Sequence, residues 1–190
     1  MADIINNLTP EGMIQIIDRQ IEKLDTMGSD DMIRLRKHLE HDASDPTMWF
    51  DLGIALNQAA MQRDYLEVDR AQLLNPGAEE MDVDGSGSTH LLEEALSVFR
   101  KVLEMEPDYY GVHTQMGIVY SNLHRFDEAE QCYLQALKED EEDFSAAYYL
   151  GLTYRDKGDE TLAQKYLALA HELNPDDDTF VNAAGLAVER

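Results

Sequence analysis

The stretch Met116-Gly117-Ile118-Val119-Tyr120 returns 34 residues later as Leu150-Gly151-Leu152-Thr153-Tyr154. In both copies an apolar residue precedes the glycine, and a tyrosine follows three positions after it. Small, larger apolar or aromatic, and small residues then follow at matching distances: Ala129, Tyr133 and Ala136, and Ala163, Leu167 and Ala170. A fixed period with apolar positions at helical spacing predicts stacked pairs of helices.

An earlier copy of the pattern begins at Leu52-Gly53, with Trp49 three residues before the leucine. Its second helix carries small and apolar residues at matching distances: Ala95, Phe99 and Val102. Pro107 and Pro175 end two of the units, since proline cannot continue a helix. The pattern resembles the tetratricopeptide repeat, a 34-residue helix–turn–helix unit. The resemblance implies an all-α fold, a right-handed α-solenoid built from a helix–turn–helix repeat array.

The resemblance also divides the chain into units. The predicted repeats are residues 46–107, 110–143 and 144–177, followed by a C-terminal capping helix at 178–190. The first repeat holds an insertion of about 30 residues at about 61–90, because Gly53 and Gly117 lie 64 residues apart. Residues 61–74 either lengthen the first helix or form a separate short one, whereas residues 78–90 have loop composition.

The N-terminal residues 1–45 do not fit the repeat and predict a helical hairpin. Thr9-Pro10 is typical of a helix start, and Gly28 marks the end of that helix. The first helix carries an apolar stripe at helical spacing: Ile14, Ile17, Ile21 and Leu24. This stripe must be buried, so the hairpin either covers the first repeat or pairs with a second copy of the chain as a homodimer.

The net charge limits the class of partner, and the cysteine content indicates the cellular compartment. The chain has 39 acidic and 15 basic residues, for a formal net charge of −24. Such a surface repels nucleic acid and anionic membranes, so we expect neither as a partner, whereas a basic protein would be attracted. The single cysteine, Cys132, excludes an internal disulfide and favours the reducing cytoplasm.

Two features could suggest a metal, and neither is complete. His38 and His41 lie one turn apart on a predicted helix, but the sequence places no third ligand beside them. Residues 82–87 resemble part of a calcium loop, yet Leu91 occupies the place where an EF-hand needs a bidentate glutamate. We interpret the histidines as exposed polar residues and predict no metal site and no cofactor.

The sequence contains no Walker A, dinucleotide-binding, HExxH or nucleophile-elbow motif. Cys132 follows no basic neighbour and is interpreted as an inert thiol. His113 occupies the position of a core aromatic in its repeat and is interpreted as a packed side chain. We therefore expect a protein that is not an enzyme.

In the family that the chain resembles, the first helix of each repeat lines a concave groove that binds a peptide or a partner helix. The residues at the groove positions are Phe50, Ile54 and Asn57 in the first repeat, Thr114, Gln115, Ile118 and Ser121 in the second, and Tyr148, Tyr149, Leu152 and Arg155 in the third. Family members that grip the C-terminal carboxylates of heat-shock chaperones use a Lys/Asn/Arg clamp, which these positions lack. Apolar and aromatic groups here favour an apolar segment instead.

The sequence thus predicts a non-enzymatic protein–protein interaction module, an adaptor, scaffold or co-chaperone. Its partner would be another protein that offers a peptide or helix segment, basic or apolar in character. Two alternatives stay open: a cytosolic secretion-type chaperone that holds an apolar client segment, and a metal-responsive regulator acting through residues 78–90. The insertion or the N-terminal hairpin could also fold across the groove and bury its residues.

Overall fold

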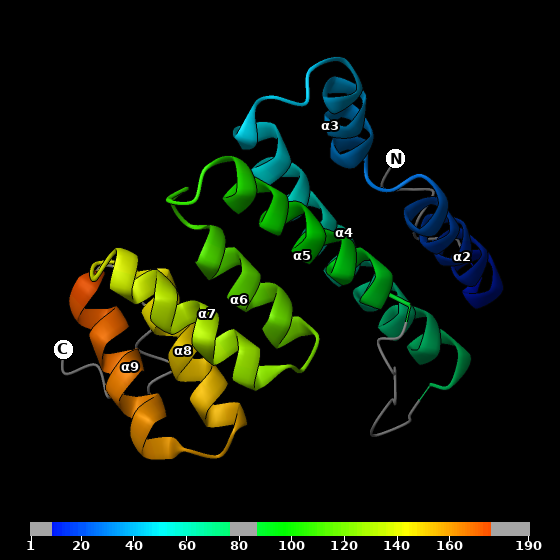
Figure 1. The fold of residues 1–190 in the computed structure, drawn as a ribbon. Coiled ribbons are helices and arrows are strands. Elements are labelled where there is room, and N and C mark those ends of the chain that lie inside the picture. Colours follow the sequence, from blue (N-terminus) through cyan, green and yellow to red (C-terminus); the bar gives the residue numbers. More distant parts are fainter. Residues whose placement is uncertain (1–8, 77–86, 176–190) are drawn as a thin grey trace. The chain divides into compact units, whose positions relative to one another are not determined.

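The structure is a computed structural model that describes residues 9–76 and 87–175 (Figure 1). Every regular element in those ranges is an α-helix, which confirms the all-α prediction. The helices are α2 (Pro10–Thr26), α3 (Asp30–His41), α4 (Pro46–Leu74), α5 (Thr89–Met105), α6 (Val112–Asn122), α7 (Phe126–Glu139), α8 (Phe144–Asp156) and α9 (Glu160–Leu173). The predicted capping helix at 178–190 lies outside the described residues, as do residues 82–86 of the segment that resembles part of a calcium loop.

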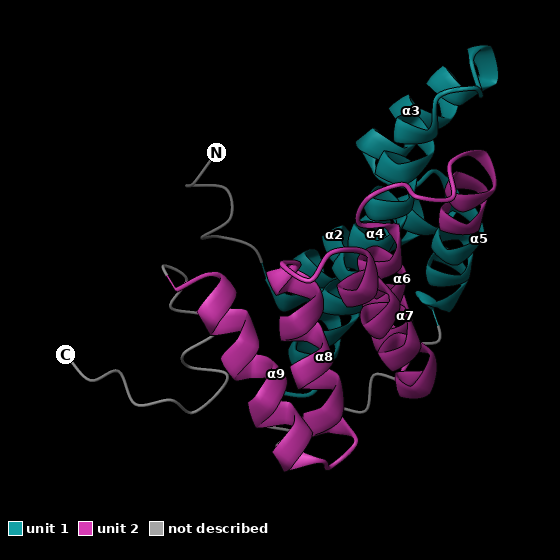
Figure 2. Cartoon of the chain, turned by 60° about the vertical axis from the view of Figure 1, so that its left-hand side comes forward, with its two compact units in different colours: residues 1–98 teal, residues 99–190 magenta. Residues whose placement is uncertain are grey.

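The chain divides into two compact units, residues 1–98 and residues 99–190, which are coloured separately in Figure 2. The division falls inside α5, so the first predicted repeat, 46–107, contributes residues to both units.

Side-chain caps set the starts of the N-terminal helices. Thr9 accepts a hydrogen bond from the Gly12 amide at 3.2 Å, and Ser29 accepts one from the Met32 amide at 3.3 Å. Asp45 in the same way accepts from the Thr47 amide at 2.9 Å, directly before Pro46. These bonds satisfy amides that have no partner inside the helix. The breaks between α2, α3 and α4 are therefore encoded locally.

Helix α4 is one continuous helix of 29 residues. Residues 61–74 therefore lengthen the first helix of the first repeat and do not form a separate one. Both α2 and α3 pack against α4. Their buried apolar residues are Leu24, Met32, Leu35 and Leu39. The hairpin thus covers α4 of the same chain. Of its predicted apolar stripe, Leu24 is buried.

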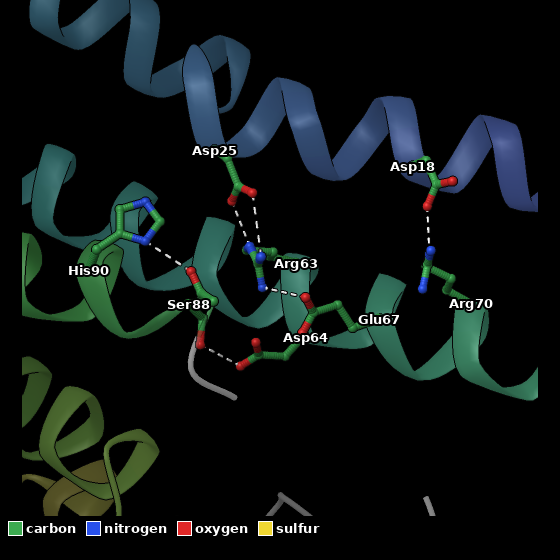
Figure 3. A network of polar contacts seen from close by, with 9 residues as sticks. Asp18, Asp25, Arg63, Asp64, Glu67, Arg70, Ser88 and His90 are labelled. Atoms are coloured by element: carbon green, nitrogen blue, oxygen red, sulfur yellow. Dashed lines mark hydrogen bonds and ion pairs between the residues drawn. The ribbon is translucent and has the colours of Figure 1, made fainter. Parts of the chain in front are cut away.

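A polar network joins α2, α4 and the start of α5 within the first unit (Figure 3). The Arg63 guanidinium donates to Asp25 of α2 at 2.6 Å and forms an ion pair with Glu67, one turn along α4, at 2.8 Å. The Arg63 side chain is only 9% exposed. Gly87 lies flush against it, because a Cβ atom on Gly87 would come within 1.7 Å of Arg63 Nη1. Ser88 completes the network by donating to Asp64 at 2.8 Å.

In the second unit each helix packs against the next along the chain, and α6 also contacts α8. The repeated glycines lie where neighbouring helices pack closely. A Cβ atom on Gly117 would approach the Tyr133 ring to 2.5 Å, and one on Gly151 would approach Leu167 Cγ to 2.7 Å. Tyr133 and Leu167 are both fully buried. Glycine is required at these places because the partner helix leaves no room for a methyl group.

Candidate protein-interaction face

The candidate face lies on α6 and α8, the first helices of the second and third repeats. We define the α6/α8 face by its partly exposed members on the two contacting helices: Gln115, Ile118, Ser121, Tyr149 and Leu152. Helical spacing places the three α6 residues on one side of that helix, and the same holds for the two from α8. Arg155, one turn beyond Leu152, is exposed.

Tyr149 is held in place by the core beneath it. Its ring stacks on the buried ring of Tyr133, with centroids 6.1 Å apart and planes 15° from parallel. The Tyr148 ring meets Tyr149 edge-on at 5.3 Å. Burial raises the pKa of the Tyr133 phenol well above its ordinary value, so that ring stays neutral. Tyr149 is thus a partly exposed aromatic side chain with a fixed orientation, the kind of group that anchors protein partners.

Hydroxyl groups tie the two helices of this face together. The Ser121 hydroxyl lies 3.3 Å from the Tyr133 hydroxyl and 3.4 Å from Thr153 Oγ1. Thr153 Oγ1 in turn donates to the Tyr149 carbonyl at 2.8 Å. These contacts link α6 to α8 and fix the position of the Ser121 and Thr153 side chains.

Thr114 does not lie on the face and is a correction to the predicted groove. It is buried, and its hydroxyl donates to Asp143 Oδ2 at 2.6 Å. The other Asp143 oxygen accepts from the Ala146 amide at 2.9 Å and caps α8. The Thr114 hydroxyl proton therefore stabilises the junction between two repeats and is not offered to a partner. The sequence itself indicates the capping role of Asp143, because an aspartate three residues before a helical amide is a common N-cap.

Tyr148 is also more internal than its groove position suggests. It packs against the buried pair Ala147 and Ala170 together with Leu137 and Leu173. Its removal would disturb the contact of α8 with α9, so Tyr149 and Leu152 are the cleaner probes of the α6/α8 face.

The three predicted groove residues of the first repeat lie on α4, in the other compact unit. Phe50 and Ile54 are half-buried, so neither the hairpin nor the start of α5 covers them completely. Asn57 is 6% exposed, which corrects the expectation that its amide would be open to a partner's backbone.

The remaining residues that the sequence offered as candidates for chemistry are three histidines and Cys132. His38 and His41 are exposed on α3, and His113 Nδ1 lies 3.0 Å from a Glu139 carboxylate oxygen. Burial raises the pKa of the Cys132 thiol to about 11, so it is protonated at neutral pH. Within residues 9–76 and 87–175 no group of three or more His, Cys, Asp or Glu side chains could hold a metal ion.

None of the helices between residues 9 and 175, outside the gap at 77–86, is long and apolar enough to cross a bilayer.

Comparison with known proteins agrees with this geometry. Tetratricopeptide repeat models match residues 91–153 and residues 145–177. Superkiller complex protein 3 of Homo sapiens is 35% identical over 81 residues, which are 43% of this chain and 5% of that protein. Anaphase-promoting complex subunit 3 of Schizosaccharomyces pombe is 22% identical over 97 residues, 51% of this chain and 15% of that protein. The chain therefore spans only a small part of the length of these relatives.

A solved structure shares the fold over most of the chain. The MamA RS-1 ArsTM double mutant superposes with a TM-score of 0.56 at 19% identity, covering 91% of this chain and 82% of that one. Repeats of this kind generally serve as non-catalytic modules for protein–protein interaction. The spacing of the glycines, the helix pairs that they pack and the matching repeat models together identify residues 91–177 as tetratricopeptide repeats.

Proposed function

We propose that the chain is a non-enzymatic adaptor or co-chaperone that holds a peptide or helix of a partner protein on the α6/α8 face. The observation that carries the proposal is Tyr149, a partly exposed ring stacked on the buried Tyr133 ring at 6.1 Å. Such a side chain loses little conformational entropy when a partner packs against it.

The chemistry of the face selects an apolar segment. Ile118 of α6 and Leu152 of α8 are partly exposed aliphatic side chains, and the partly exposed Gln115 has an amide for the partner's backbone. Basic residues flanking that segment would be drawn by the net charge of −24. A cytoplasmic partner fits best, since the one thiol, Cys132, suits a reducing compartment.

Site-specific photo-crosslinking tests this proposal. A benzophenone amino acid would replace Ile118 or Leu152 in the full chain, and each protein would be irradiated in lysate of the source cells. The matched control carries the same group at Gln131, an exposed position on the second helix α7. We expect a partner adduct from positions 118 and 152 that excess wild-type protein competes away.

An equal adduct from position 131, or an adduct from that position alone, would place the partner on another surface. Circular dichroism of each protein guards against a substitution that unfolds the repeats.

A further inference from the structure

An apolar cleft of about 540 Å³ lies in the first unit, outside the α6/α8 face. It is formed by the first turns of α2 and the last turns of α4, which run antiparallel. Asp25, late in α2, pairs with Arg63, whereas Asp18, earlier in α2, pairs with Arg70, later in α4 (Figure 3). Its apolar lining residues are Pro10, Met13, Ile16, Ile17, Leu73 and Pro76.

This end of the hairpin keeps apolar surface exposed. Of the predicted stripe on α2, only Leu24 at the far end is buried, while Ile14, Ile17 and Ile21 are half-buried. Ile16 is 41% exposed, and Leu74 at the end of α4 is 56% exposed. Contiguous apolar surface of this kind on a strongly charged protein is typical of an interaction site.

The electrostatics of the cleft favour a cation. Asp69 lines it. The last turn of α4 carries no basic side chain, so nothing on that turn offsets the partial negative charge of its terminal carbonyls. The partial positive charge of the amides at the start of α2 is already offset, because Thr9 caps the Gly12 amide and Glu11 lies in the first turn. Arg70, the nearest guanidinium on α4, is bound to Asp18.

We propose that this α2/α4 cleft is a second docking site, which takes an amphipathic helix of a partner protein with bulky apolar anchors and a Lys or Arg placed opposite Asp69. Helices dock in grooves of this kind through apolar residues spaced one turn apart. A second copy of the chain is a poor occupant, because two molecules with a net charge of −24 repel each other. The site lies in the first unit and does not depend on the proposed function of the α6/α8 face.

Peptide display tests the proposal without a known partner. Random peptides of about 12 residues would be selected on the full chain, then tested individually by fluorescence anisotropy against variants. Ile16→Asp alters the cleft, and Ile33→Asp is its matched control, a 36% exposed isoleucine on α3 outside the cleft lining. Asp69→Asn removes the charge alone. Leu152→Ala alters the α6/α8 face and identifies peptides that bind there.

We expect a class of peptides with two bulky apolar residues one turn apart and at least one Lys or Arg. Ile16→Asp should weaken their binding by at least about tenfold, while Ile33→Asp and Leu152→Ala leave it unchanged. Asp69→Asn should weaken it by about threefold or more and reduce its dependence on salt.

Four results would overturn the proposal. Selection could yield no peptide that depends on Ile16, or only peptides that lack basic residues. Binding could appear only after deletion of residues 1–8, which would make the chain's own N-terminus the occupant. Finally, sedimentation could show a dimer that Ile16→Asp dissociates, which would make a second copy the occupant.

Discussion

At the repeated glycines, one added methyl group would collide with a side chain of the neighbouring helix. Gly117 sits in the middle of α6, where alanine would ordinarily stabilise a helix by about 0.5–1 kcal/mol. Here the added methyl group would lie 2.5 Å from a carbon of the Tyr133 ring. That ring is fully buried and stacked on Tyr149, so it has little freedom to move away.

We therefore predict that Gly117→Ala lowers the free energy of unfolding by about 1–3 kcal/mol, the cost of overpacking a filled core. Urea denaturation followed by circular dichroism measures it. A variant as stable as wild type, or more stable, would mean that α6 and α7 do not cross as closely as described.

Cys132 gives a second prediction at the residue scale. Since burial raises the pKa of its thiol to about 11, only about one molecule in a thousand carries the thiolate at pH 8. Reaction with a thiol reagent should be slow in the native protein, faster as the pH approaches 11, and rapid at pH 8 in denaturant. Rapid labelling of the native protein at pH 8 would contradict the raised pKa of this half-buried thiol.

The same raised pKa has a consequence for stability. The unfolded thiol releases its proton near pH 9, before the native thiol does near pH 11. The unfolded state therefore binds fewer protons in this range, and the contribution of Cys132 to stability falls as the pH rises. Tyr154, whose pKa burial raises to about 12, acts in the same direction at still higher pH.

At the scale of helices, the two arginines of α4 form ion pairs with α2 that differ in burial. Arg63 is 9% exposed and joins α2 to α4, and Gly87 packs against its guanidinium. Arg70 makes a similar bond to Asp18, but both side chains are more than 40% exposed. Removing a buried cation leaves its carboxylates without a counter-charge, whereas an exposed pair is already screened by water.

Arg63→Met should accordingly destabilise the first unit by about 2–4 kcal/mol, and the matched variant Arg70→Met by less than about 1 kcal/mol. The fluorescence of Trp49, the only tryptophan in the chain, reports unfolding of this unit. Equal effects of the two variants would show that the Arg63 network contributes no more than a surface ion pair.

The repeats could be predicted from the sequence because each packing rule is local. The glycine, alanine and tyrosine positions recur at one period, and the caps at Thr9 and Asp45 are visible in a few neighbouring residues. The fate of Thr114 could not be predicted in the same way. Its position in the repeat is correct for the groove, but its hydroxyl is turned to Asp143, 29 residues away. The α2/α4 cleft also depends on how two distant helices meet.

Charge acts at the scale of the whole molecule. A net charge of −24 on 190 residues makes the folded state repel itself, and salt screens this repulsion. We predict that raising NaCl from about 20 to about 300 mM increases the melting temperature by a few degrees. A melting temperature that falls with added salt would mean that specific ion pairs such as Arg63–Asp25 outweigh the general repulsion.

We propose that the α6/α8 face binds the partner. The most direct measurement is the affinity of the crosslinked partner for wild type, Leu152→Ala and the matched control Gln131→Ala, by surface plasmon resonance with folding verified by circular dichroism. We predict that Leu152→Ala weakens binding by about tenfold or more, while Gln131→Ala binds like wild type. Unchanged affinity for Leu152→Ala would contradict the claim and move the binding site away from the first helices of these repeats.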